Sequence, residues 1–176
     1  MIIYRELCLD EISRELFSNF QRRQDVTRCW RKIDGVWHIK DIAFVDDWTE
    51  QEYEELTQYL KNTILTNGSV TGAFVEGQLK GFASIESTLF GDYNQYMDLS
   101  SIHVSQDLRG NGIGKELFQS VKAHAKKHGA QKLYISAHSA IESQAFYRAM
   151  GCVEAEEYNR EHVEKEPYDC QLECRL

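Results

Sequence analysis

The sequence predicts one α/β domain in which a mixed, mostly antiparallel β-sheet is flanked by helices. Near residue 70 the hydrophobic residues change from helical spacing to the alternation that is typical of strands. A glycine-rich loop at residues 109–115 then joins a strand-like run to an amphipathic helical run. The chain has 176 residues, 42% of them hydrophobic, and one proline, which suits a single folded domain with one core.

The N-terminal region, residues 1–67, is expected to be mainly helical. Asp10 is a suitable N-cap for a first helix that places Ile12, Leu16 and Phe20 on one face. Residues 24–47 show no clean period, and we expect an ordered loop or a hairpin there. A capping box at residues 49–52 begins a second helix, which ends at residues 67–68.

The rest of the chain, residues 70–176, is expected to form the sheet and two more helices. The predicted strands lie at residues 70–76, 79–89, 95–104, 132–138, 152–157 and 168–175, with a hairpin turn at residues 77–78. The predicted helices lie at residues 115–127 and 141–150. No linker or internal repeat divides the chain, so we expect a single domain over residues 1–176.

The glycine-rich loop from Arg109 to Lys115 has the composition of an anion site. Gly110, Gly112 and Gly114 allow a tight turn and leave backbone N–H groups uncovered. The following helix start adds unpaired donors and the positive end of its dipole, so a phosphate or pyrophosphate is the expected ligand. The spacing matches neither the P-loop, which needs four residues between its glycines, nor the dinucleotide fingerprint, whose third glycine comes three positions after the second.

Two motifs resemble the GNAT superfamily of acyl-CoA-dependent N-acetyltransferases. Arg109, Gly112 and Gly114 follow its Arg-x-x-Gly-x-Gly pattern. Residues 145–152, Ala-Phe-Tyr-Arg-Ala-Met-Gly-Cys, are similar to its Phe-Tyr-x-x-x-Gly-Phe signature, with Cys152 in place of the last Phe. The resemblance covers residues 70–176 and implies a GNAT-like fold with acetyl-CoA as co-substrate, and it leaves residues 1–67 as the acceptor side.

The resemblance also implies which residues contact acetyl-CoA. In the family the loop holds the pyrophosphate of coenzyme A, and the backbone of the preceding strand pairs with the pantetheine arm like an added strand. The family often has an Asn seven residues before the Tyr, where this chain has Ala140 beside Ser139. The expected contacts are Ile102, His103, Val104, Arg109, Gly110, Asn111, Gly112, Ile113, Gly114, Lys115, Ser139 and Tyr147.

Acetyl transfer to an amine needs a proton donor for the departing thiolate and a neutral nucleophile. Tyr147, at the Tyr position of the family, is the candidate acid. An alkyl amine with a pKa near 10 is almost wholly protonated at pH 7, and freeing it costs about 4 kcal/mol unless a base or an acidic pocket helps. The candidate bases are Asp98, which shares a face with Ile102 if the strand is regular, and Glu86, with His138 as a rival.

Composition restricts the partners. A net charge of −8 disfavours nucleic acid. No apolar run could span a membrane, no signal peptide is evident, and five irregularly spaced cysteines favour the reducing cytoplasm. His124 and His128 are one helical turn apart but stand beside two lysines and do not form a His-Glu-x-x-His motif, so no metal is expected.

We therefore expect a cytoplasmic N-acetyltransferase that transfers acetyl from acetyl-CoA directly to a primary amine of a small molecule or peptide. The acidic net charge is compatible with a cationic acceptor. Three alternatives stay open: transfer of another acyl group, a non-catalytic acyl-CoA-binding or regulatory module of the same fold, and a nucleotide-binding protein. A homodimer also stays open.

Overall fold

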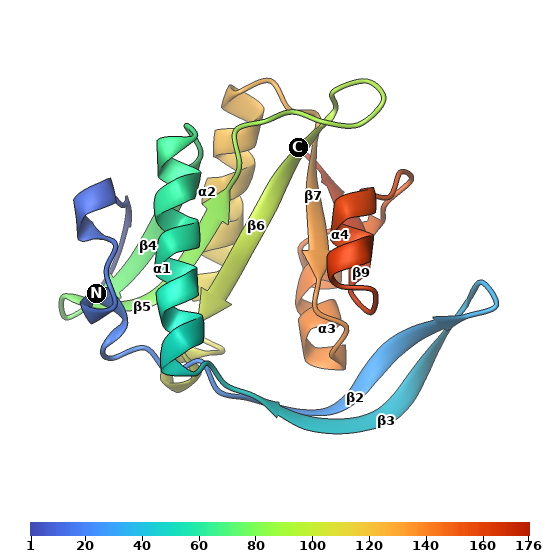
Figure 1. Ribbon diagram of the computed structural model, residues 1–176, viewed down its shortest axis with the longest axis horizontal. Coiled ribbons are helices and arrows are strands. Elements are labelled where there is room, and N and C mark those ends of the chain that lie inside the picture. Colours follow the sequence, from blue (N-terminus) through green and yellow to red (C-terminus); the bar gives the residue numbers. More distant parts are fainter.

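A computed structural model describes residues 1–176. A seven-stranded sheet crosses the molecule in the order β1–β4–β5–β6–β7–β9–β8 (Figure 1). Its strands are β1 (Ile2–Glu6), β4 (Ser69–Val75), β5 (Gln78–Ile85), β6 (Tyr96–Val104), β7 (Lys132–Ala137), β8 (Val153–Glu154) and β9 (Cys170–Arg175). All neighbours are antiparallel except β6 and β7, which are parallel. The predicted fold class is confirmed.

The parallel pair β6–β7 is incomplete. Tyr96, Met97 and Asp98 pair with Lys132, Leu133 and Tyr134, and the register stops there. Beyond Asp98 the two strands diverge, while β5 continues to pair with the other edge of β6 up to Val104. From Leu99 onward no strand pairs with the edge of β6 that faces β7, and such a free edge presents N–H and C=O groups that no neighbouring strand uses. This gap in the sheet positions the candidate site.

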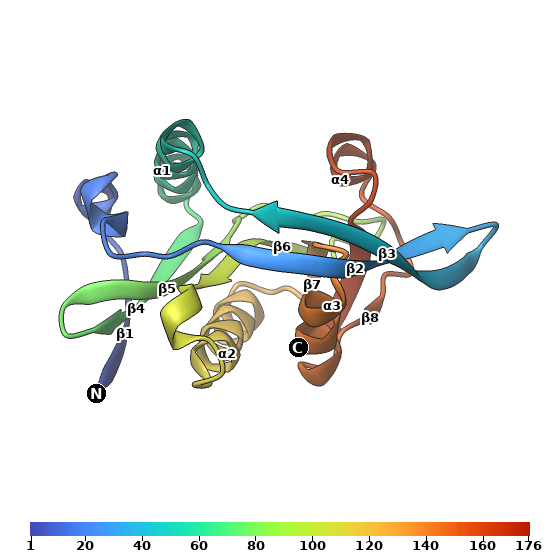
Figure 2. The same cartoon turned by 90° about the horizontal axis from the view of Figure 1, so that it is seen from below.

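Helices cover both faces of the sheet. α1 (Glu50–Leu65) and α4 (Arg160–Lys165) lie on one face, and α2 (Ile113–Lys127) and α3 (Ile141–Ala149) lie on the other (Figure 2). The larger core lies on the α2 face, and a smaller core on the α1 face includes Leu60 and Phe82. The predicted capping box begins α1, because Thr49 Oγ1 accepts a hydrogen bond from Glu52 N–H at 3.2 Å. No helix combines the length and the apolarity that a membrane crossing requires.

Residues 24–46 form a long hairpin of β2 (Gln24–Ile33) and β3 (Val36–Asp46), one of the two predicted structures for this segment. Its turn places Asp34 and Gly35 at positive φ, as a tight hairpin requires. Trp30 N–H donates to Ser139 O at 2.8 Å and ties the hairpin to the segment after β7. The hairpin then extends past α3 as an arm (Figure 1).

The prediction of a single helix from Asp10 to Phe20 is wrong. The segment instead makes two 3₁₀ turns, η1 (Leu9–Glu11) and η2 (Glu15–Phe17). Its buried residues are Ile12, Phe17 and Phe20, which do not form a helical stripe, because tertiary packing of Phe17 and Phe20 on Phe82 decides the conformation. β1 and α4 were not predicted from the sequence, and both are short and largely exposed.

Candidate active site

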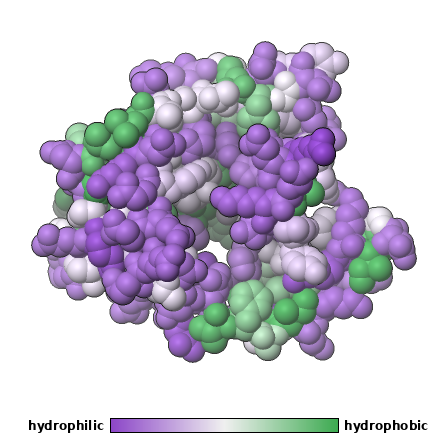
Figure 3. All heavy atoms as spheres, viewed as in Figure 1, coloured by the Kyte–Doolittle hydropathy of each residue, from purple (hydrophilic) through white to green (hydrophobic).

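A cleft of about 1160 Å³ lies where β6 and β7 diverge. The end of β6, the glycine loop, the start of α2 and part of α3 line it, together with residues of the β2–β3 hairpin. On the face of the sheet that carries α1 and α4, the surface is hollowed between these two helices and is mostly hydrophilic around the hollow (Figure 3). The structure thus brings the predicted loop and Tyr147 into one cleft.

The glycine loop leaves its backbone donors uncovered. The first hydrogen bond at the start of α2 runs from Glu116 N–H to Gly112 O at 3.2 Å, and no N–H from Gly110 to Lys115 donates to another protein group. Gly110 and Gly112 have φ of 81° and 80°, and a Cβ at either would point into open space. Only glycine adopts this left-handed conformation without strain. Free N–H groups at the positive end of a 15-residue helix form an anion site.

Arg109 is bent back over the end of β6. Its Nε donates to Val104 O at 3.1 Å, and its Nη2 donates to Arg22 O at 3.2 Å. Partial burial and then the charge of Arg22 lower the pKa of Arg109, but a guanidinium stays charged at neutral pH. Arg22, Arg109 and Lys115 all line the cleft; Arg22 pairs with Asp46 at 2.8 Å, so Arg109 and Lys115 supply the unpaired positive charge at this end. Asn111 does not line the cleft; its amide donates to Leu108 O at 3.1 Å and braces the loop.

The free edge of β6 carries Ile102, His103 and Val104 along the cleft. Ile102 and Val104 pack toward the larger core, whereas the ring of His103 lies 4.8 Å from that of Trp48 on the other face. Burial, followed by the charges of Arg22 and Arg109, lowers the pKa of His103 well below its usual value, so this imidazole is neutral at pH 7.

A β-bulge interrupts β6 at Ser100. Ile85 of β5 pairs with Leu99 and Ser84 pairs with Ser101, so Ser100 is one extra residue on β6. The hydroxyls of Ser100 and Ser101 both reach Ser84 Oγ. The expectation that Asp98 shares a face with Ile102 is wrong, because the bulge changes the alternation between them.

Tyr147 lies on α3, lines the cleft and is 9% exposed. Its ring packs edge-on against that of Phe146, with centroids 5.2 Å apart. Burial, then the neighbouring groups Cys152 and Asp169, raises the pKa of Tyr147 above its usual value. The phenol is therefore protonated throughout the neutral range, as a proton donor must be.

The two predicted carboxylates do not line the cleft. Glu86 accepts hydrogen bonds from Thr63 Oγ1 at 2.8 Å and from Ser100 Oγ at 2.8 Å, below α1. Asp98 Oδ2 lies 2.8 Å from Nε2 of His162 on α4, and its Oδ1 is buried without a partner. That hydrogen bond is the main reason why the pKa of His162 is raised. Both carboxylates thus lie on the α1 and α4 face of the sheet.

His138 lines the cleft, but its ring nitrogens are engaged. Nδ1 accepts a hydrogen bond from Ala140 N–H at 3.1 Å, so the proton of the neutral ring is on Nε2, which lies 3.6 Å from Asp46. A ring whose only lone pair is already occupied is a poor general base. Ser139 is buried and does not line the cleft, because its hydroxyl accepts a hydrogen bond from Arg31 at 2.7 Å.

Asp169, just before β9, is a cleft residue that the sequence analysis did not single out. Its carboxylate accepts a hydrogen bond from Ser136 Oγ at 3.0 Å and forms no ion pair. Burial is the main cause of a raised pKa of Asp169. Nothing in its local sequence marks it, since it lines the same cleft as Tyr147 only because β9 pairs with β7 beside the gap.

The comparisons with known proteins agree with this geometry. The family profile described as "Acetyltransferase (GNAT) family" matches residues 33–152. The chain belongs to the GNAT acetyltransferase family. Enzymes of this family use acetyl-CoA as co-substrate. No curated protein sequence matches the chain significantly.

Solved structures share the fold of this GNAT chain. A putative streptothricin acetyltransferase from Bacillus anthracis str. Ames, in complex with acetyl coenzyme A, is similar at a TM-score of 0.73 and 17% identity, covering 100% of this chain and 99% of that one. Nourseothricin acetyltransferase has a TM-score of 0.71 at 13% identity, covering 99% and 98%. PaiA N-acetyltransferase from Thermoplasma acidophilum, in complex with coenzyme A, has a TM-score of 0.60 at 15% identity, covering 100% and 99%.

Proposed function

We propose that this GNAT protein transfers the acetyl group of acetyl-CoA directly to a cationic primary amine of a small molecule or peptide. One observation carries the proposal: a single cleft is lined by an anion site, by a protonated tyrosine and by Asp169, a carboxylate that forms no ion pair. The five free cysteines favour a reducing compartment such as the cytoplasm.

The donor end fits coenzyme A. The uncovered N–H groups from Gly110 to Lys115 would hold the pyrophosphate, with Arg109 and Lys115 adding positive charge. The free edge of β6, from Ile102 to Val104, would pair with the amide groups of the pantetheine arm as an added strand does. Acetyl-CoA thus supplies an activated thioester, and the protein supplies a backbone cradle of fixed shape.

The transfer itself needs a proton donor for the sulfur that leaves. Tyr147 is the group in the cleft suited to this, because its phenol is protonated and its ring is held by Phe146. A positioned acid of this kind typically contributes about 10²–10⁴-fold to the rate.

The acceptor end favours a cation. Asp169 would attract an ammonium group and accept its proton, directly or through one water. Asp98 and Glu86 lie on the α1 and α4 face, where they would add negative potential along the approach of the amine. We therefore give the role of base to Asp169 and keep Asp98 and Glu86 as the alternatives.

An acceptor screen tests the proposal. Purified protein is mixed with acetyl-CoA and a panel of diamines, lysine peptides, aryl amines and matched alcohols, and the free thiol released is measured. We expect release with at least one cationic amine, no release with its matched alcohol, and an N-acetyl product by mass spectrometry. Acetyl-CoA binding without release across the panel would instead favour the non-catalytic module.

A further inference from the structure

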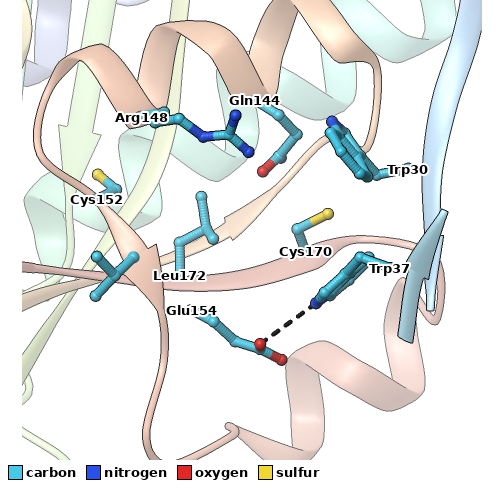
Figure 4. Close-up of a pocket in the computed structure, with 9 residues that line it drawn as sticks. Trp30, Trp37, Gln144, Arg148, Cys152, Glu154, Cys170 and Leu172 are labelled. Atoms are coloured by element: carbon cyan, nitrogen blue, oxygen red, sulfur yellow. Dashed lines mark hydrogen bonds between the residues drawn. The ribbon is translucent and has the colours of Figure 1, made fainter. Parts of the chain in front are cut away.

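A second, smaller pocket of about 260 Å³ lies behind α3, under the hairpin arm. Trp30 and Trp37 of the hairpin form one wall, and Leu172 of β9 lies across from them (Figure 4). Gln144 and Arg148 of α3 enter from above. None of the residues that line this pocket lines the cleft proposed for acetyl-CoA.

The Arg148 guanidinium and the side-chain oxygen of Gln144 form no hydrogen bond or ion pair with the protein in this pocket. Arg148 forms no ion pair; it extends across the pocket, and its guanidinium carbon is 5.8 Å from the centroid of the Trp30 ring (Figure 4). Gln144 is 8% exposed and uses its amide N–H to donate to His138 O at 2.7 Å, while its side-chain oxygen points into the pocket. The pocket therefore offers a charged donor and a side-chain amide acceptor.

The one carboxylate that lines the pocket is already neutralised. Glu154 pairs with Lys32 at 2.7 Å and accepts a hydrogen bond from Trp37 Nε1 at 3.3 Å. The unpaired charge in the pocket is thus that of Arg148, which favours an anion. The indole faces favour a flat, apolar body, since aromatic rings bind aromatic and other planar groups well.

We propose that this pocket is a binding site for a small aromatic carboxylate. The ring would lie against Trp30 and Trp37, the carboxylate would accept hydrogen bonds from Arg148, and a ring hydroxyl or N–H would donate to Gln144 Oε1. A volume of about 260 Å³ holds a fragment of benzoate size and is too small to enclose coenzyme A. A ligand this small is expected to bind with a dissociation constant on the order of 1 mM.

The three tryptophans of the chain make the test specific. In ¹H–¹⁵N spectra of the full-length protein, titration with 4-hydroxybenzoate should shift the indole N–H signals of Trp30 and Trp37 and leave that of Trp48 unchanged. Trp48 packs on the other side, against His103 and Phe82. Arg148→Met should weaken binding about tenfold, and Arg175→Met, which removes an exposed charge elsewhere on the surface, should not.

Four outcomes would overturn the proposal. They are no shift of Trp30 and Trp37 up to about 10 mM ligand, equal affinity for the flexible, non-aromatic hexanoate, unchanged affinity in Arg148→Met, and a shift of Trp48 alone. If the two indole signals move with protein concentration in the absence of ligand, a second copy of the chain occupies this face instead.

Discussion

The raised pKa of Tyr147 leads to a prediction about turnover. Tyr147→Phe removes the phenolic proton and keeps the ring that packs on Phe146. We expect kcat to fall about 100-fold, while the affinity for acetyl-CoA stays within about twofold. The measurement is steady-state kinetics on an amine found in the screen, beside calorimetry of acetyl-CoA binding. An unchanged kcat under conditions where chemistry limits the rate would reduce Tyr147 to a packing role.

Asp169 leads to a prediction about pH. The carboxylate accepts a proton only when ionised, so kcat/KM should fall as the pH drops through the raised pKa of Asp169. Asp169→Asn should lower the rate most near pH 7 and least near pH 10, where more of the amine is already neutral.

Glu142→Gln is the matched control, because Glu142 also lines the cleft but is exposed and does not contribute to the raised pKa of Asp169. The parental rate and pH profile in Asp169→Asn would return the role of base to Asp98, Glu86 or solvent. Asp98→Asn and Glu86→Gln, measured in the same series, distinguish among these.

At the scale of elements, α4 is held to the sheet by a titratable contact. His162 stacks on Tyr134, with ring centroids 5.7 Å apart, and its Nε2 lies 2.8 Å from Asp98 Oδ2. The hydrogen bond to Asp98 raises the pKa of His162 in the folded state above its usual value of 6.5. Stabilisation from this pair is therefore complete below about pH 6.5 and is lost as the pH rises through the folded-state pKa.

His162→Gln tests this contact. The glutamine amide can still donate a hydrogen bond to Asp98, but it does not titrate as the imidazole does. We expect it to lower the free energy of unfolding by about 1 kcal/mol at pH 6, with a smaller loss at pH 9, because the pair is partly exposed. Denaturant unfolding at both pH values is the measurement, and His38→Gln, on the exposed arm, is the control. A loss of equal size at both pH values would show that the contact is not linked to protonation.

At the scale of the molecule, the part of the fold that local pattern governs could be predicted. The strands from residue 70 to 104, the capping box at Thr49 and the helix after Gly112 follow from alternation, capping and glycine placement, and all three are present. The segment around Phe17 could not be predicted, because its partners come from β5.

The candidate site likewise has a part that could be predicted from the sequence and a part that could not. The anion loop is a local motif, and the sequence analysis predicted it, together with Tyr147, in the region that lines the cleft. The bulge at Ser100 depends on how β6 pairs with β5, and the position of Asp169 depends on how β9 pairs with β7. Both are long-range registers, so Asp98 was assigned to the wrong face and Asp169 was overlooked.

Calorimetry of three proteins measures whether the glycine loop binds acetyl-CoA. Gly112 and Gly77 both have positive φ, 80° and 77°, and a Cβ at either meets no atom within 4 Å, but only Gly112 lines the cleft. Alanine at either position should therefore cost about 1 kcal/mol of stability. We expect Gly112→Ala to bind acetyl-CoA at least about tenfold more weakly and Gly77→Ala to bind like the parent. Parental affinity in a folded Gly112→Ala protein, or no acetyl-CoA binding by the parent, would show that the glycine loop is not an acetyl-CoA site.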